Sequence, residues 1–309
     1  MTDFLIGTGG WAYFKVPGIH PLAAYSRAFN FVEANSTFYQ IPKKENVKSW
    51  RKRVPTDFQF SVRCNKRITH ELNFKSVPEA FDILDEMVRI CEILKAKFLH
   101  FQTPPSFNYN RINGEKVKDF FESAKINNLR IALETRNPNL LNSSFVKSLQ
   151  ELNIIHCVDL LKGIKPAYPS DILYTRLFGK GHHNIYQPLD RELRQINNTA
   201  SEEGIQKAII TMHSNRMFKD AARFKIFKET GEFPMVTKST GINSLVEVLK
   251  EDTKFPSNKT ELLYHQGWKI IDLDPSNRVH ASDLLQQLPE KEYYGIDDIV
   301  QTLGDQTIG

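Results

Sequence analysis

Residues 77–102 read VPEAFDILDEMVRICEILKAKFLHFQ and contain two segments with different hydrophobic patterns. The first part carries apolar residues at helical spacing, on one stripe: Phe81, Leu84, Met87, Val88, Cys91 and Leu94. The second part, Lys97 to Gln102, is a short apolar run of the length that buried strands have. This stretch therefore predicts an amphipathic helix that leads into a buried strand.

The same alternation of short apolar runs and helical segments extends through the first 215 residues. Eight runs are rich in Ile, Val, Phe or Leu: Phe4–Thr8, Phe29–Asn35, Gln59–Cys64, Lys97–Gln102, Arg130–Thr135, Ile154–Asp159, Ile172–Phe178 and Ala208–His213. Strands that alternate with helices form parallel sheets, and eight such units in this length match an α/β fold of the (β/α)₈ or TIM-barrel type. A doubly wound open sheet is the alternative, but Gly7-Thr8-Gly9-Gly10 does not form the dinucleotide-binding fingerprint.

The pattern changes after about residue 225. We expect a barrel domain over residues 1–228 and a small acidic C-terminal module over 229–309, with a break at Thr230 to Pro234. Helical spacing recurs at 242–249, 281–288 and 296–303, and a single strand is expected at 268–273. The module is thus predicted to be mainly helical, with a winged-helix-like arrangement as one hypothesis.

Composition and charge indicate a globular protein with an uneven charge distribution. Of the 309 residues, 40% are hydrophobic and 25% are charged, which excludes a disordered, collagen-like or coiled-coil chain. Residues 225–309 contain nine Lys and Arg and fourteen Asp and Glu, so this part is acidic. Because the whole chain has a net charge of +5, residues 1–224 are strongly basic. The basic part favours an anionic partner, either a small molecule or a nucleic acid, while plain surface solubility is the alternative.

Neither a membrane segment nor a disulfide framework is indicated. No apolar run approaches the roughly 20 residues of a membrane helix, and Met1 to Leu5 does not resemble a signal peptide, so a cytoplasmic protein without a membrane partner is expected. Cys64, Cys91 and Cys157 have no paired spacing, and Cys64 and Cys157 are expected to fill the core. The sequence does not indicate the oligomeric state.

Polar residues gather where the predicted strands end. In a barrel these carboxyl ends form the active face, and residues two apart on a strand share a side. Seven strands contribute polar groups there: Glu33 and Asn35, Arg63, His100 and Gln102, Glu134 and Arg136, Asp159, Arg176, and His213 and Asn215. Burying so many charges is costly unless they are paired, so the hypothesis is a functional site, with a structural ion-pair network as the alternative. Taken by itself, His100 fits a core histidine with its hydrogen bonds satisfied slightly better than a catalytic histidine.

Three loops add candidate groups to this face. Lys66, Arg67 and His70 form a basic segment after the third strand, where Thr69 to Glu71 could instead cap a helix. Tyr39 follows the second strand and Trp11 the first, and aromatic side chains beside basic ones suit a sugar or a base. The loop from Gly179 to His183 follows the seventh strand, where many barrels bind phosphate, although a simple surface loop fits it equally well.

Several of these motifs together resemble the YecE-like family, also called domain of unknown function 72. They are 6–11 (IGTGGW), 33–39 (EANSTFY), 68–70 (ITH), 101–107 (FQTPPSF) and 133–136 (LETR), and the resemblance extends to about residue 225. It implies a TIM barrel without a settled activity. It places on the family's motif positions Glu33, Asn35, Tyr39, His70, Gln102, Glu134, Arg136 and Asn215. This chain departs from the family pattern at Arg63, Thr103 and the segment 213–215.

The leading functional hypothesis is a hydrolase that acts on an anionic, phosphate-containing substrate, which includes nucleic acid. The candidate catalytic residues are Glu134, Glu33, His70 and Asp159. The candidate substrate-binding residues are Trp11, Asn35, Tyr39, Arg63, Arg67, Gln102, Arg136, Arg176 and Asn215. A divalent metal version would recruit His70, His213 or the His182-His183 pair, but no metal-binding spacing is present. The alternatives are a glycosidase-like enzyme that uses Glu33 and Glu134 as paired carboxylates, and a non-catalytic protein that binds an anionic ligand or RNA.

Overall fold

The computed structural model describes residues 2–306, which divide into two compact units. The first unit contains the described residues up to Leu177 together with 198–213 and 217–222. The second contains 178–197, 214–216 and the described residues from Arg223 onward. Each unit has its own hydrophobic core, and each is described here by itself.

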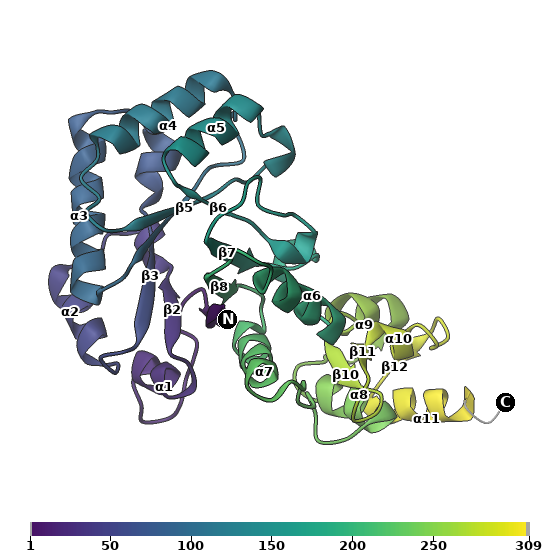
Figure 1. Ribbon diagram of the computed structural model, residues 1–309. Helices are drawn as coiled ribbons and strands as arrows, with labels where there is room; N and C mark the ends of the chain where they lie inside the picture. The colour runs from purple at the N-terminus through teal and green to yellow at the C-terminus, as the bar shows by residue number, and fades with distance from the viewer. Residues whose placement is uncertain (1, 307–309) are drawn as a thin grey trace. The chain divides into compact units, whose positions relative to one another are not determined.

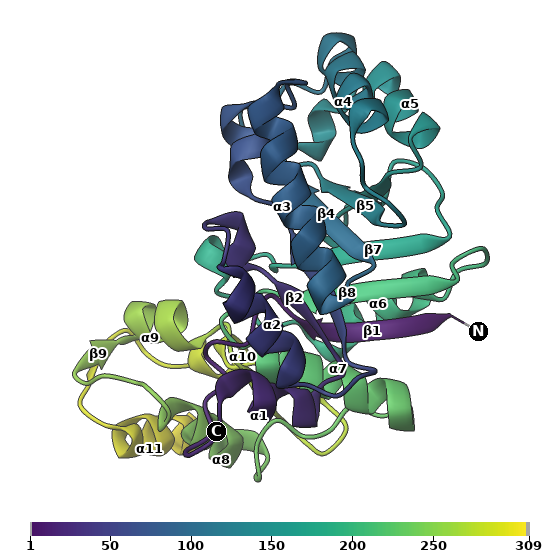
Figure 2. The same cartoon turned by 90° about the vertical axis from the view of Figure 1, so that its left-hand side faces the viewer.

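The first unit is built on eight strands, one for each apolar run in the sequence. They are β1 (Asp3–Thr8), β2 (Phe31–Ala34), β3 (Gln59–Arg63), β4 (Phe98–Gln102), β5 (Arg130–Glu134), β6 (Ile155–Cys157), β7 (Ile172–Leu177) and β8 (Lys207–Met212). They pair in parallel in two ladders, β2-β3-β4-β5-β6 and β1-β8-β7. Figure 2 shows β1, β8 and β7 lying side by side.

Two seams join the ladders into a barrel. At the first, Val158 continues β6 and forms a parallel bridge with Thr175 of β7. At the second, β1 lies so close to β2 that a Cβ on Gly7 would be 2.3 Å from the carbonyl oxygen of Phe31. The fold is therefore the expected (β/α)₈ barrel, with its strands in sequence order around the circle.

Helices follow most of the strands. The α-helices are α1 (Pro21–Ala28), α2 (Lys44–Lys52), α3 (Pro78–Leu94), α4 (Arg111–Ser123), α5 (Ser143–Glu151), α6 (Asp190–Ala200) and α7 (Met217–Thr230). The helix predicted before β4 is confirmed as α3, which packs against β3 and β4 (Figures 1 and 2). Residues 158–171, all of them described, hold only the short 3-10 helix η4 (Leu160–Lys162) in place of an α-helix. No helix within residues 2–306 has the length and apolar character that crossing a bilayer requires.

The inside of the barrel changes from apolar to polar along the strands. Its apolar layer contains Leu5, Phe31, Phe98, Ala132, Ile155, Cys157, Ile172, Tyr174 and Ile209. Two residues further along the same strands, the alternation of side chains places Glu33, His100, Glu134, Arg176 and Thr211 on the same inner side. The carboxyl ends of the strands, called the mouth below, are thus lined with polar groups above a dry core.

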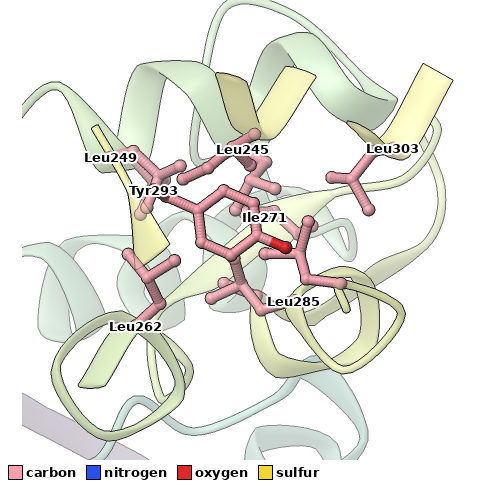
Figure 3. Packing of buried hydrophobic residues seen from close by; sticks show 11 residues of the cluster. Leu245, Leu249, Leu262, Ile271, Leu285, Tyr293 and Leu303 are labelled. Atoms are coloured by element: carbon pink, nitrogen blue, oxygen red, sulfur yellow. The ribbon is translucent and has the colours of Figure 1, made fainter. Parts of the chain in front are cut away.

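The second unit is mainly helical, as expected. Besides most of α6 and the second half of α7, it contains the helices α8 (Gly241–Leu249), α9 (Lys259–Gln266), α10 (Ser282–Leu285) and α11 (Ile296–Gln306). The expected single strand is one partner of a hairpin, β10 (Ile270–Asp272) with β11 (Arg278–His280), and β9 (Ser257–Asn258) pairs with β12 (Glu292–Tyr293). Figure 3 shows the Tyr293 ring among Leu245, Leu249, Leu262, Ile271, Leu285 and Leu303, all buried. The winged-helix hypothesis stays a prediction.

Candidate active site

Arg176 is the centre of the mouth. Its guanidinium donates to Glu33 Oε1 through Nε at 3.2 Å and Nη2 at 3.0 Å. Its Nη1 donates to Glu134 Oε2 and, at 3.2 Å, to Gln102 Oε1. The side chain of Arg176 is 1% exposed, and Glu33 is fully buried. Arg176 therefore pairs with two carboxylates, one from β2 and one from β5, in a place that water hardly reaches.

Arg63 extends this network toward the surface of the mouth. Its Nη1 donates to Asn35 Oδ1 at 2.8 Å, and its Nη2 donates to Gln102 Oε1. The guanidinium also lies 3.5 Å from the centre of the Phe38 ring, a cation–π contact that fixes its plane. Gln102 thus accepts from both Arg63 and Arg176, so one amide oxygen aligns two cations.

A layer of side chains below the network holds Glu33 in place. Tyr174 OH donates to Glu33 Oε2 at 2.9 Å and lies 2.9 Å from Ser61 Oγ. His213 Nε2 lies 3.6 Å from Glu33 Oε1 and 3.1 Å from Thr211 Oγ1. A Cβ on Gly9 would collide with the His213 ring, so only glycine there lets the imidazole occupy this place. Both oxygens of Glu33 therefore have partners supplied by the protein.

The two buried carboxyls stay ionised. Burial by itself raises the pKa of Glu33, but Arg176, with His213, His100 and Arg63, outweighs it and lowers that pKa to about 2. For Glu134, burial again raises the pKa, and Arg176 foremost, then His100 and Arg136, hold it well below its usual value. Neither carboxyl is thus available as a proton donor near neutral pH.

The histidines near the mouth stay neutral. Burial lowers the pKa of His100 and of His213, and the positive charge of Arg176 lowers both further. His70 has its pKa lowered by burial and by the charges of Arg63, Lys66 and Arg136. Because an ordinary histidine titrates near 6.5, each imidazole here is uncharged at pH 7.

The rim of the mouth presents the accessible groups. Arg136 has a side chain that is 34% exposed, with Nε 3.4 Å from Glu134 Oε1. His70 Nδ1 lies 2.7 Å from Thr69 Oγ1, and the ring packs edge-on against Phe38. Tyr39 is 66% exposed and its ring centre lies 6.0 Å from the Arg63 guanidinium. These side chains are the ones that an incoming ligand would meet.

Other predicted site residues have different surroundings. The Trp11 ring packs against Trp50 of α2 and against Phe60 of β3. Arg67 lies in the π-helical turn η2 (Arg67–Glu71) and forms exposed ion pairs with two glutamates. Asp159 Oδ1 caps η4 by accepting from the Leu161 backbone at 3.0 Å.

The segment 214–216, which follows β8, and the loop after β7 belong to the second unit. Asn215 is exposed, and its backbone N–H donates to Asn184 O at 3.3 Å. In the predicted phosphate loop, Lys180 Nζ donates to Glu192 Oε1 at 2.6 Å, so its charge is already paired. The side chain of His182 lies outside the described part of the chain.

Sequence reasoning missed Tyr174. The alternation that singled out Arg176 also places Tyr174 on the inner side of β7, so the signal was present. His100 is fully buried, and its Nε2 lies 3.4 Å from Glu134 Oε2. Of the groups that could hold a metal, His100, Glu134 and Cys157 lie within 4.8 Å of one another through their ligand atoms.

Comparison with known proteins agrees with the sequence motifs. The YecE protein of Escherichia coli K12 is 40% identical over 68 residues, which are 21% of this chain and 25% of YecE. The YunF protein of Bacillus subtilis 168 is 28% identical over 151 residues, which are 45% of this chain and 53% of YunF. The aligned region thus spans a quarter to about half of these relatives.

Solved structures with the same fold carry the same family name. A DUF72 family protein from Thermotoga maritima MSB8 superposes with a TM-score of 0.59 at 19% identity, over 74% of this chain and 99% of that one. A DUF72 family protein from Enterococcus faecalis V583 gives 0.56 at 18%, over 75% and 98%. The model of the family described as "Protein of unknown function DUF72" matches residues 5–229. The chain therefore belongs to the DUF72 family, as its motifs predicted.

Proposed function

We propose that the mouth binds a phosphate-bearing substrate and hydrolyses one of its ester bonds. The observation that carries this proposal is the charge balance of the mouth. The guanidiniums of Arg63, Arg136 and Arg176 outnumber the carboxylates of Glu33 and Glu134, while the nearby histidines are neutral. A site with one uncompensated positive charge favours an anionic group over a neutral one.

The residues divide into groups that meet the substrate and groups that hold the site. Arg136 is the most exposed arginine of this network, and a phosphate that reaches it would gain charge-assisted hydrogen bonds, while Arg63 is buried behind it and donates to Asn35 and Gln102. His70 is neutral and partly exposed, with Nδ1 held by Thr69, so Nε2 can take a proton. Glu33, Glu134 and Gln102 position the arginines. Asp159 and Trp11 serve local structure in their present surroundings and have no part in this proposal.

The proposed step needs only water as co-reactant. His70 Nε2 accepts a proton from a water molecule as its oxygen attacks phosphorus. The phosphorus–oxygen bond to the leaving alcohol breaks, and the alkoxide takes a proton from solvent. His70 then returns its proton to solvent. The guanidiniums stabilise the charge that develops on the phosphoryl oxygens.

The geometry does not favour a glycosidase. Such an enzyme needs one carboxylic acid whose pKa is raised so that it can protonate the leaving group. Glu33 and Glu134 share Arg176, and the pKa of each is lowered. Both carboxyls are therefore ionised where a glycosidase requires one of them to be protonated.

The test is turnover of phosphate esters by the full chain. We would incubate it with end-labelled single- and double-stranded DNA and RNA and with bis(p-nitrophenyl) phosphate, with Mg²⁺, Mn²⁺, Zn²⁺ or a chelator. His70→Gln is expected to lower kcat by roughly 100-fold or more with KM little changed. Arg136→Gln is expected mainly to raise KM. Arg111→Gln, a surface arginine paired with Glu115, is the matched control.

The outcomes separate the candidate functions. Hydrolysis that His70→Gln abolishes and Arg111→Gln retains supports the proposal. Hydrolysis that is equal in all variants comes from a contaminant or another group and contradicts it. Binding of the labelled nucleic acids without cleavage under any condition replaces the proposal with the non-catalytic alternative.

A further inference from the structure

We propose that His100, Glu134 and Cys157 form a zinc-binding site inside the barrel, beneath the mouth. The inference goes beyond the proposed hydrolysis and does not depend on it. The three side chains come from neighbouring strands, β4, β5 and β6, and all are buried. Within residues 2–306 they form a group whose imidazole nitrogen, carboxylate oxygen and sulfur atoms lie within 4.8 Å of one another.

The spacing of the ligand atoms is close to that around one metal ion. With zinc bonds of about 2.0 Å to nitrogen and oxygen and 2.3 Å to sulfur, tetrahedral ligands lie about 3.3–3.6 Å apart. His100 Nε2 and Glu134 Oε2 are 3.4 Å apart already. Cys157 pairs in register with Glu134 on the neighbouring strand, and its sulfur lies within 4.8 Å of the other two ligand atoms. A shift of at most about 1.3 Å therefore brings it to the ligand spacing of a zinc ion.

His100 supplies an independent sign that a ligand belongs here. The side chain is 0% exposed, yet Nδ1 has no hydrogen-bond partner and Nε2 faces only the Glu134 carboxylate, at 3.4 Å and without hydrogen-bond geometry. Buried polar atoms in native proteins are nearly always paired with protein, water or an ion. A metal ion at Nε2 would satisfy the lone pair that faces Glu134.

The donor set and the charges select zinc. A thiolate, an imidazole and a carboxylate together suit Zn²⁺ better than Mg²⁺ or Ca²⁺, which take oxygen ligands. With Cys157 deprotonated by the metal, the ion is neutralised by Cys157 and Glu134, and Arg176 is neutralised by Glu33. The buried cluster is then neutral as a whole. Arg176, which donates to Glu134, becomes a partner that orients this metal ligand.

Three protein ligands leave a fourth position for water or a substrate atom. That number is typical of catalytic zinc sites, whereas structural ones are closed by four protein ligands. Of the three side chains, Glu134 is 9% exposed, whereas His100 is 0% and Cys157 is 1% exposed. The three residues therefore predict a zinc ion with one position left for a ligand that the protein does not supply.

The experiment is metal binding by the full chain, purified without a metal-affinity tag. The apoprotein is titrated with Zn²⁺ against a chromogenic chelator, and Co²⁺ is added separately to look for a cobalt–thiolate absorption band in the near ultraviolet. We expect about one metal per chain, together with that band. Cys157→Ser and His100→Gln should each weaken Zn²⁺ binding by more than roughly tenfold, and Cys157→Ser should remove the band.

Two matched variants guard against trivial results. Cys64→Ser and Cys91→Ser change the other buried cysteines and should keep both the affinity and the band. Circular dichroism of each variant without metal shows whether it is folded, and the melting temperature with Zn²⁺ added should rise in the wild type but not in Cys157→Ser. Zinc binding that survives Cys157→Ser, or a wild type without bound metal, overturns the proposal. Neither readout involves turnover, so either result leaves the hydrolysis proposal to its own test.

Discussion

Arg176 is the side chain that holds the buried hydrogen-bond network of the mouth together. It ties β2 to β5 through Glu33 and Glu134 and shares Gln102 with Arg63. Burying these ions costs free energy, which is offset only while every charge keeps its partner. Stability alone therefore does not account for Arg176, because well-packed apolar residues are often as stabilising as a buried ion pair.

Replacing Arg176 by Met should therefore be strongly destabilising. The change leaves Glu33 fully buried without its main cation, and the free energy of unfolding should fall by about 3–5 kcal/mol. Urea unfolding measures it. Arg111→Met, at an exposed position, should stay within about 0.5 kcal/mol of the wild type. The double variant Arg176→Met with Glu33→Gln should regain part of the loss, and a loss below about 1 kcal/mol in the single variant would contradict this account.

Glu33 should make stability depend on pH in the acid range. Its pKa is lowered from 4.5 to about 2 by folding, so the folded state favours the ionised carboxyl. The resulting stabilisation, about 3 kcal/mol, is complete above pH 4.5 and is lost as the pH falls toward 2. Urea unfolding of wild type and Glu33→Gln between pH 5 and 2 should show a shallower decline in the variant. Parallel curves for the two proteins would rule out this role of Glu33.

Which residues line the mouth could be predicted from the sequence, but their roles could not. Alternation along a strand is a local property, so it correctly placed Glu33, Arg63, Glu134 and Arg176 on one side. That Arg176 is shared by two carboxylates depends on contacts between strands far apart in the chain. Trp11 follows a strand in a loop, where alternation does not apply, and its ring packs on Trp50.

At the scale of elements, the seam between β1 and β2 is held by a side chain. No ladder joins these two strands, but Tyr25 of α1 bridges them. Its hydroxyl accepts from the Thr8 backbone N–H at 3.1 Å and donates to the Phe31 carbonyl at 2.9 Å. The close approach of the backbones at Gly7 makes this bridge possible. A helix thus closes the barrel where strand pairing does not.

Tyr25→Phe should weaken this seam. Removing the hydroxyl leaves a buried N–H on β1 and a buried carbonyl on β2 with one partner fewer, at a cost of about 1–3 kcal/mol. Hydrogen exchange should show faster exchange of the Thr8 amide. Tyr264→Phe, on a side chain 65% exposed, is the control and should change neither stability nor exchange. An unchanged Thr8 amide would show that the bridge is not what protects β1.

The strands were predictable and the crossovers less so. All eight apolar runs became strands within one or two residues, because burial inside a barrel demands apolar side chains on both sides. The crossover between β6 and β7, every residue of which is described, contains no α-helix. It contains Pro166 and Pro169, and a proline cannot lie inside an α-helix without breaking it. Of the hairpin β10–β11, the sequence predicts only the first strand, because a strand of three residues is too short to show an alternating pattern.

At the scale of the whole molecule, the second unit is assembled from separate parts of the chain. Residues 178–197, which follow β7, belong to it together with the residues from Arg223 onward. Gln187 Oε1 accepts from the Ile270 backbone at 3.0 Å, and Asp190 Oδ2 accepts from Arg278 Nε at 2.6 Å. Contacts so distant in sequence leave no local signal, so the changes of pattern and charge near residue 225 indicate only the part of the unit that follows them.

These contacts predict what truncation will do. A chain ending at residue 228, where the barrel domain was predicted to end and the family match nearly stops, lacks Ile270 and Arg278. Asp190 would lose a buried ion-pair partner, and the segment 178–197 would lose the core it packs on. We expect amides in 178–197 to exchange faster in 1–228 than in the full chain, while those in β3 to β5 keep their protection. Circular dichroism establishes that the shorter chain is folded. Equal protection of 178–197 in both chains would mean that this segment is stabilised within residues 1–228, and that the predicted boundary at residue 228 separates two independent domains.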